Sequence, residues 1–304
     1  MDKVKIYNHL IELIGKERVL IDEPMKNHTS FKIGGPADIM VIPESIEEIQ
    51  CALKVCIEND VPYFVMGNGS NLIVRDKGMR CVVIKIGDNL KDVKINGNIV
   101  TAQAGILLST LSKKIMAESL KGFEFASGIP GTLGGAITMN AGAYGGEMKD
   151  VVKGAKLLDK NGEIKHFSLK ELELGYRTSI IQKKGYIVLE VELELEKGNY
   201  EEILSITKDL TEKRTTKQPL HLPSAGSVFK RPEGYFAGKL IQDSGLKGKS
   251  VGGAQVSELH SGFIVNTGNA TAKDVLDLIA LVQKKVKENF GVDLHTEVRI
   301  IGEE

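Results

Sequence analysis

The sequence predicts an α+β protein, with helices and strands distributed over all 304 residues. Three patterns lead to this prediction. Residues 187–196, IVLEVELELE, alternate apolar side chains with glutamates, as a strand with one wet face does. Residues 46–56 and 271–290 repeat apolar side chains at helical spacing. Residues 127–146, SGIPGTLGGAITMNAGAYGG, contain seven glycines and no charge, so we expect tight turns there rather than a helix, a plain strand or a linker.

The elements of the N-terminal half follow from local signals. Residues 1–15 have the pattern of an amphipathic helix and lack the apolar core of a signal peptide. An apolar strand covers 37–42, and Ser45 with Glu48 predicts a capping box that opens the next helix. Residues 63–66 are expected to form a short buried strand that runs into the loop GNGSNLIV, 67–74. Strands at 81–86 and 98–105 and a helix at 106–119 follow.

The β pattern ends at about 197–200, and residues 201–214 have a helical pattern. We place a domain boundary there, which gives domains of 1–200 and 201–304. In the second domain we expect a short helix at 236–244, a strand at 262–266 and a long helix at 271–290. Thr271 and Asp274 cap the start of the long helix, and Gly291 ends it. A final strand covers 296–301.

The composition excludes several classes of protein. The chain carries 40 basic and 40 acidic residues, and this zero net charge argues against a nucleic-acid-binding protein. No apolar run approaches the roughly 18 residues of a membrane span. Cys51, Cys56 and Cys81 form no CxxC pair, and the six histidines have no metal-binding spacing. We therefore expect no disulfide framework, no metal site, and reduced thiols in a cytoplasmic protein.

Two glycine-rich segments, 67–74 and 127–146, point to a bound anion. Glycine lets the backbone bend so that successive N–H groups face one group, and such a nest suits phosphate oxygens. The first loop follows a strand but lacks the GKS or GKT of a P-loop, and it is not GxGxxG opening a helix. An ordinary Asn-Gly turn is the alternative for that loop taken alone.

Four further stretches carry reactive or charged side chains. Each also has an ordinary structural interpretation, because most arginines, lysines and alternating glutamates lie on the surface and AGSVF is not the GxSxG of a serine nucleophile. The stretches are GYRTS at 175–179 with Arg177, KRTTKQPL at 213–220 with Arg214 and Lys217, LPSAGSVFKRP at 222–232 with Ser227 and Lys230, and LHTEVRIIG at 294–302 with Glu297.

Taken together and in order, these motifs resemble those of the UDP-N-acetylenolpyruvoylglucosamine reductases, flavoenzymes of bacterial peptidoglycan precursor synthesis. The resemblance covers about 27–302 and rests on NHTSFKIGGPAD, GNGSN, SGIPGTLGGAITMNAGAYG, GYRTS, RTTKQP, SAGSVFKRP and TEVRIIG. It implies a two-subdomain FAD-binding clasp of the PCMH type in 1–200, split near 85–90, and a C-terminal α+β substrate domain in 201–304.

The resemblance also implies roles for individual residues. Arg177, Ser227 and Glu297 would be catalytic, and Tyr144, Lys217 and Lys230 would bind the UDP-sugar substrate. FAD, bound non-covalently and reduced by NADPH, would contact a larger set, namely Gly67, Asn68, Gly69, Ser70, Asn71, Leu72, Ser127, Gly128, Ile129, Pro130, Gly131, Gly134, Gly135, Asn140, Gly142 and Arg214. No metal is implied.

The implied reaction passes hydride from the flavin to the vinyl carbon distal to the substrate carboxylate. Arg177 would then bind the carboxylate as charge develops, and Ser227 would protonate the adjacent carbon. Glu297 has two open roles: it either donates to the carboxylate in its protonated form or orients Arg177 or a water.

The chain departs from the family pattern at Arg231, where the family often has Asn, and at His28 and Lys32 in the first motif. The short interval from Arg177 to Ser227 resembles the subclass that lacks an inserted tyrosine-bearing loop. Three alternatives are another FAD oxidoreductase of the same clasp, such as a sugar or hydroxy-acid oxidase, a non-catalytic nucleotide-binding module, and a bare scaffold. We expect a monomer.

Overall fold

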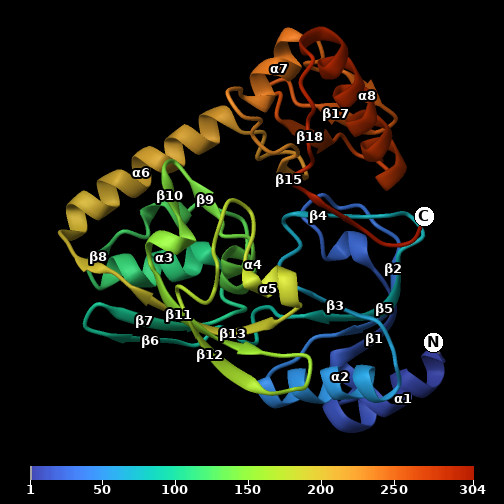
Figure 1. The fold of residues 1–304 in the computed structure, drawn as a ribbon, viewed down its shortest axis with the longest axis vertical. Coiled ribbons are helices and arrows are strands. Elements are labelled where there is room, and N and C mark those ends of the chain that lie inside the picture. The colour runs from blue at the N-terminus through green and yellow to red at the C-terminus, as the bar shows by residue number, and fades with distance from the viewer. Residues whose placement is uncertain (1) are drawn as a thin grey trace. The chain divides into compact units, whose positions relative to one another are not determined.

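The computed structural model describes residues 2–304 and divides into two compact units (Figure 1). Unit 1 comprises the chain up to residue 21, 39–68 and 81–214, and unit 2 comprises 22–38, 69–80 and 215–304. These units differ from the two continuous domains that the sequence predicts. The C-terminal division falls at 214/215, inside the long helix α6 (Tyr200–Lys217), rather than at 200/201.

The N-terminal part of the chain forms a four-stranded sheet in the order β1-β2-β5-β3. β3 pairs parallel with β5, and the helices α1 and α2 pack against each other, as the two blue helices in Figure 1 show. The α1 prediction is confirmed over residues 3–14, while Met1 lies outside the described residues. The element bounds are α1 Lys3–Ile14, β1 Val19–Pro24, β2 Pro36–Val41, α2 Ile46–Glu58, β3 Tyr63–Met66, β4 Leu72–Val74 and β5 Met79–Lys85.

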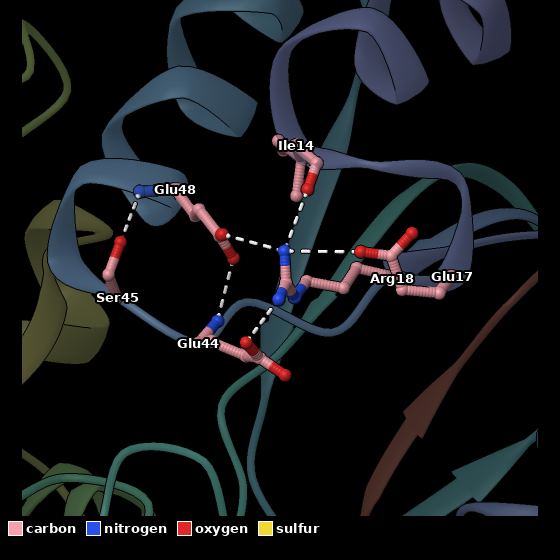
Figure 2. Close-up of polar contacts among 6 residues, drawn as sticks. All are labelled: Ile14, Glu17, Arg18, Glu44, Ser45 and Glu48. Atoms are coloured by element: carbon pink, nitrogen blue, oxygen red, sulfur yellow. Dashed lines mark hydrogen bonds and ion pairs between the residues drawn. The ribbon is translucent and has the colours of Figure 1, made fainter.

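The capping box predicted for α2 is correct only in its first half. Ser45 Oγ accepts the Glu48 N–H at 3.1 Å, but the Glu48 carboxylate accepts the Glu44 N–H at 2.8 Å instead of reaching back to Ser45. The Arg18 guanidinium lies among these groups, 3.2 Å from Glu48 Oε1 and also paired with Glu44 (Figure 2). Arg18 also donates to the Ile14 carbonyl at 3.0 Å, so it links the end of α1 to the start of α2.

The second sheet of unit 1 is antiparallel, with five strands in the order β12-β11-β13-β7-β6. In β13 the residues 187, 189, 191 and 193 are buried, whereas Glu190 and Glu192 face Lys156 and Lys153 on the outer side. The predicted strand with one wet face is therefore confirmed. The strand bounds are β6 Val93–Asn96, β7 Ile99–Gln103, β11 Val152–Leu158, β12 Ile164–Ser168 and β13 Ile187–Glu194.

Helices and short strands complete unit 1, whose core is one continuous apolar cluster running from Ile6 to Leu195. Each fully buried aliphatic side chain in such a core contributes about 1.5–3 kcal/mol relative to an exposed one. The remaining bounds are α3 Leu108–Ala117, β8 Leu120–Lys121, α4 Leu133–Thr138, β9 Gly142–Ala143, β10 Gly146–Glu147, α5 Ile180–Lys184 and β14 Glu196–Lys197.

Unit 2 has a separate core, in which N-terminal residues such as Phe31 and Ile73 pack with Val228 and Val275 from the C-terminal part. This shared core explains why unit 2 contains two N-terminal segments. The long helix begins and ends as predicted, with Thr271 and Asp274 in a capping box and Gly291 left-handed at φ 70°. The bounds are β15 Ser224–Ser227, α7 Ala237–Asp243, β16 Ser250–Val251, β17 Ala254–Val256, β18 Phe263–Asn266, α8 Ala272–Phe290 and β19 Arg299–Ile301.

The sheet of unit 2 has the order β15-β18-β17-β16, and α8 packs on β16 and β17. The C-terminal strand β19 pairs parallel with β4, so the residues that follow the first glycine loop lie beside the chain's last strand. Among residues 2–304, no helix combines the length and the apolar composition that crossing a membrane requires.

Candidate active site

The first glycine loop leaves its backbone donors available. None of the N–H groups from Gly67 to Asn71 has a hydrogen-bond acceptor among residues 2–304. Gly69 is left-handed at φ 65°, a conformation that glycine adopts without strain. Successive unpaired N–H groups in a bent loop form a site for several negative oxygens. This geometry fits the pyrophosphate of the predicted cofactor.

The two glycine-rich segments meet inside unit 1. A Cβ built on Gly67 would lie 2.1 Å from Thr132 Oγ1, so only glycine brings the loop this close to the second segment. Thr132 is buried, and its hydroxyl accepts the Gly135 N–H at 3.4 Å as the N-cap of α4. Sequence analysis missed Thr132, although a threonine directly before an apolar residue at a helix start is a recognisable N-cap signal.

The prediction that residues 127–146 contain no helix is wrong for α4. Thr132 caps the start of this six-residue helix, and its first N–H groups donate to distant carbonyls, from Leu133 to Ile106 and from Gly134 to Ala104. A Cβ on Gly134 would lie 2.9 Å from the Ala104 Cβ, so glycine permits close packing here. Tertiary contacts therefore outweigh the low helix propensity of glycine.

Arg214 lies against the start of the same segment. A Cβ built on Gly128 would be 2.9 Å from Arg214 Cδ, and the side chain comes from the last turns of α6. Burial lowers the pKa of the Arg214 guanidinium, and the neighbouring Tyr144 opposes this shift. The group nevertheless stays a cation at neutral pH. This arrangement places a half-buried positive charge beside the glycine turns.

Other predicted cofactor contacts have different surroundings. The Asn71 side chain donates to the Glu297 carbonyl at 3.3 Å, and Leu72 is buried in β4. The Asn140 side chain is fully buried and bonded to protein groups. The remaining predicted residues lie in or beside the two loops, and their contacts with the cofactor stay predictions. Gly69 and Gly134 are buried, and the others are half-buried or exposed. The set is Asn68, Gly69, Ser70, Ser127, Ile129, Pro130, Gly131, Gly134, Gly135 and Gly142.

Arg177 is positioned by a tight turn of unit 1. Gly175 and Thr178 exchange two backbone hydrogen bonds of 3.0 and 3.2 Å, which leaves Tyr176 and Arg177 at the tip. Arg177 is left-handed at φ 55°, and its guanidinium lies 5.3 Å from the centre of the Tyr176 ring. A half-buried, oriented guanidinium of this kind can bind a carboxylate through two parallel hydrogen bonds.

Ser227 and Glu297 lie on neighbouring segments of unit 2. Ser227 ends β15 directly after Gly226, which is left-handed at φ 77°, and pairs with Phe263 of β18. The Glu297 N–H donates to the carbonyl of Val228, the residue after Ser227, at 2.7 Å. The Asn71 carbonyl accepts the N–H of Arg299, so three motifs that are far apart in the sequence meet here. Among the described residues, no cluster of His, Cys, Asp or Glu could hold a metal ion.

The three predicted substrate contacts are exposed. Tyr144 follows α4 in unit 1 with φ 54° and is 48% exposed. Lys217 ends α6, and Lys230 donates its backbone N–H to the His295 carbonyl at 2.8 Å in unit 2. Arg231, the departure from the family pattern, places its guanidinium 4.0 Å from the centre of the Phe236 ring. Exposed cations and an exposed phenol are available to a ligand, and their contacts with substrate stay predictions.

Comparisons with known proteins agree along the whole chain. Residues 37–168 match the family model described as FAD binding domain, and residues 218–301 match UDP-N-acetylenolpyruvoylglucosamine reductase, C-terminal domain. The chain is 76% identical to the UDP-N-acetylenolpyruvoylglucosamine reductase of Alkaliphilus oremlandii over 100% of both chains. It is 58% identical to that of Clostridium perfringens over 98% of each. The crystal structure of the enzyme from Thermus caldophilus has a TM-score of 0.80 at 35% identity, covering 93% of this chain and 97% of its own.

Proposed function

Because the chain belongs to the UDP-N-acetylenolpyruvoylglucosamine reductase family, we propose that Arg177, Ser227 and Glu297 carry out its reaction. The chain is an FAD-dependent oxidoreductase that uses NADPH to reduce the enolpyruvyl ether of UDP-N-acetylglucosamine enolpyruvate in peptidoglycan precursor synthesis. Bound FAD supplies the hydride that enters the carbon–carbon double bond. Family membership favours this reaction over that of a sugar or hydroxy-acid oxidase and over a module without catalysis.

The cofactor is held by the two glycine-rich segments. The N–H groups of residues 67–71 bind pyrophosphate oxygens, and the contact between Gly67 and Thr132 sets the distance between the two segments. Arg214 adds a positive charge beside Gly128. Because backbone N–H groups and glycines do most of this binding, the cofactor site needs few charged side chains.

Arg177 binds the substrate carboxylate. Hydride addition at the far vinyl carbon places negative charge on the carbon that bears this carboxylate and on its oxygens. A guanidinium that is already oriented stabilises this charge without reorganising, and one such donor typically contributes about 3–4 kcal/mol of transition-state stabilisation. The turn from Gly175 to Thr178 provides the orientation.

Ser227 protonates the carbon next to the carboxylate. A serine hydroxyl is a weak acid, but a carbon with carbanion character is basic enough to take its proton. Glu297 lies beside this serine, since its N–H donates to the Val228 carbonyl. The single observation that carries the proposal is this adjacency, in which Ser227, Glu297 and Asn71 of the first glycine loop come together in unit 2.

The variant Ser227→Ala tests the assignment. We expect the purified variant to keep the absorbance of bound FAD and to be reduced by NADPH at the normal rate. Reoxidation by the UDP-enolpyruvyl sugar should fall about 10²–10⁴-fold, the typical contribution of a positioned acid. Ser205→Ala, an exposed serine of α6, is the matched control. Reoxidation of Ser227→Ala at the wild-type rate would exclude Ser227 as the proton donor.

We further propose that the chain works as a cytoplasmic monomer. None of its three cysteines is in a disulfide, and burial raises the pKa of Cys56 to about 12, which keeps that thiol protonated and unreactive. The zero net charge and the scattered exposed apolar side chains are compatible with a monomer. Light scattering of the purified holoenzyme tests this: a mass near 33.1 kDa is expected, and twice that mass would contradict it.

A further inference from the structure

Asn140 is fully buried, and its side-chain amide makes three hydrogen bonds to other parts of the protein. Its Nδ2 donates to Glu147 Oε2 at 2.7 Å and to the Gly175 carbonyl at 3.1 Å. Its Oδ1 accepts the backbone N–H of Lys149 at 2.9 Å. Both N–H donors and one of the two lone pairs of the oxygen are used, and the residue has no exposed surface through which a cofactor could reach the other. A buried amide that is bonded in this way holds the groups that it contacts in fixed positions.

The contacts of Asn140 lead to Arg177. The Gly175 carbonyl that Asn140 binds is also the carbonyl that closes the turn with Thr178. The Asn140 main-chain carbonyl accepts from Arg177 Nη1 at 3.5 Å. One residue therefore touches both the base of the turn and the guanidinium that the turn presents.

A second group holds the turn from its other end. Gln182 Nε2 donates to the Arg177 carbonyl at 3.3 Å and to the Thr138 carbonyl at 2.7 Å. Ser179 Oγ donates to the same Thr138 carbonyl at 2.7 Å. The turn is thus attached at both ends to residues 138–140, which form the C-terminal end of α4 and the two residues after it in the glycine-rich segment.

The backbone is left-handed on both sides of this junction. Asn140 has φ 42°, which asparagine tolerates well, and Arg177 has φ 55°, which costs an arginine free energy that its surroundings must offset. Such strained residues cluster where a site needs a fixed geometry. The hydrogen bonds of Asn140, Ser179 and Gln182 maintain the geometry of this turn.

We propose that Asn140 is a positioning residue that sets the orientation of Arg177 toward the substrate carboxylate, rather than a ligand of FAD. This inference rests on the proposed role of Arg177. Because a displacement of about 1 Å can slow a reaction about 10²-fold, loss of the Asn140 amide should act on the step that Arg177 assists. It should leave cofactor binding and reduction by NADPH unchanged.

The first test separates the two half-reactions of Asn140→Ala by stopped-flow absorbance. We expect the FAD content to be unchanged and reduction by NADPH to stay within about 2-fold of wild type. Reoxidation by the UDP-enolpyruvyl sugar should be about 10–100-fold slower. Asn98→Ala, an exposed asparagine between β6 and β7, is the control and should match wild type. Loss of FAD, or equal slowing of both half-reactions, would overturn the proposal.

The second test is a double-mutant cycle with Arg177→Ala. If Asn140 acts through Arg177, adding Asn140→Ala to Arg177→Ala should slow reoxidation by less than about 2-fold more. If Asn140→Ala slows reoxidation by the same factor in the Arg177→Ala background as in wild type, the proposal is overturned. If Arg177→Ala alone reoxidises at the wild-type rate, the role proposed for Arg177 fails instead.

A third variant covers the case in which Asn140→Ala does not fold. Gln182→Met removes the donor to the Arg177 carbonyl at the other end of the turn and keeps a similar volume. The same cycle applies, and slowing of reoxidation that persists in the Arg177→Ala background would again overturn the proposal.

Discussion

The contact between the two glycine-rich segments gives a direct test of the cofactor site. In Gly67→Ala the new Cβ would lie 2.1 Å from Thr132 Oγ1, whereas ordinary contacts begin at 3.4 Å, so one side must move by about 1.3 Å. If Thr132 rotates away, α4 loses its N-cap, which costs about 0.5–2 kcal/mol. If the loop moves instead, its displacement exceeds the roughly 0.5 Å within which the groups of a binding site must be held.

We therefore expect Gly67→Ala to bind FAD at least about 10-fold more weakly, which corresponds to about 1.4 kcal/mol. Titration of the apoprotein with FAD, followed by quenching of flavin fluorescence, measures this. Gly87→Ala is the matched control, because its Cβ would meet nothing within 4 Å and its φ is not positive. An FAD affinity equal to that of Gly87→Ala would refute the reasoning.

The double variant Gly67→Ala with Thr132→Ala identifies the clashing atom. Removing Oγ1 relieves the closest contact but also removes the helix cap. We expect FAD affinity to recover in part, while the free energy of unfolding stays about 0.5–2 kcal/mol below wild type. If FAD affinity does not recover, the clash with Thr132 is not the cause of the weaker FAD binding in Gly67→Ala.

Three further predictions concern stability, measured by urea unfolding of the holoenzyme. Arg18→Met should lower the free energy of unfolding by about 1–3 kcal/mol, because the partly buried Ile14 carbonyl and Glu48 carboxylate lose their donor, without changing FAD content; an unchanged midpoint would contradict this. Asp76→Ala should cost about 1 kcal/mol, since the carboxylate accepts the first two N–H groups of α8 at 2.8 and 2.9 Å, and a loss below about 0.3 kcal/mol would argue against this cap. The backbone hydrogen bond from Thr271 holds the pKa of Asp274 below its usual 3.8, so its contribution is full above about pH 4 and is lost as pH falls through the lowered pKa. The difference in stability between wild type and Asp274→Asn should therefore shrink below about pH 4, and a constant difference would contradict this sign.

The elements that the sequence predicts correctly depend on neighbouring residues. The alternation in 187–194, the cap formed by Thr271 and Asp274, and the end of α8 at Gly291 are all expressed within a few residues. Their physics is local, because a strand face repeats every two residues and a helix terminus is satisfied by its own first and last turns. Ser45 shows the limit, since the distant Arg18 lies among the acidic groups beside the cap.

The candidate site divides in the same way. The order of motifs identified the family and nominated Arg177, Ser227 and Glu297, but each of these side chains, taken alone, has an ordinary structural interpretation. Their settings come from contacts over long distances in the sequence, such as Asn71 with Glu297 and Asn140 with Gly175. The family resemblance nominated Asn140 as a cofactor contact, and only the folded chain shows that its side-chain amide bonds to Glu147, Lys149 and Gly175.

The sequence by itself determined the class of protein, the glycine-rich backbone that can approach a phosphate, and the elements whose signals are local. Only the tertiary structure decided that a helix forms within residues 127–146, that Phe31 and Ile73 share a core with the C-terminal part, and that Thr132 lies against Gly67. The reason is physical: helix caps and strand faces are set by adjacent residues, whereas close packing and the pairing of buried polar groups depend on which distant segments the folded chain brings together.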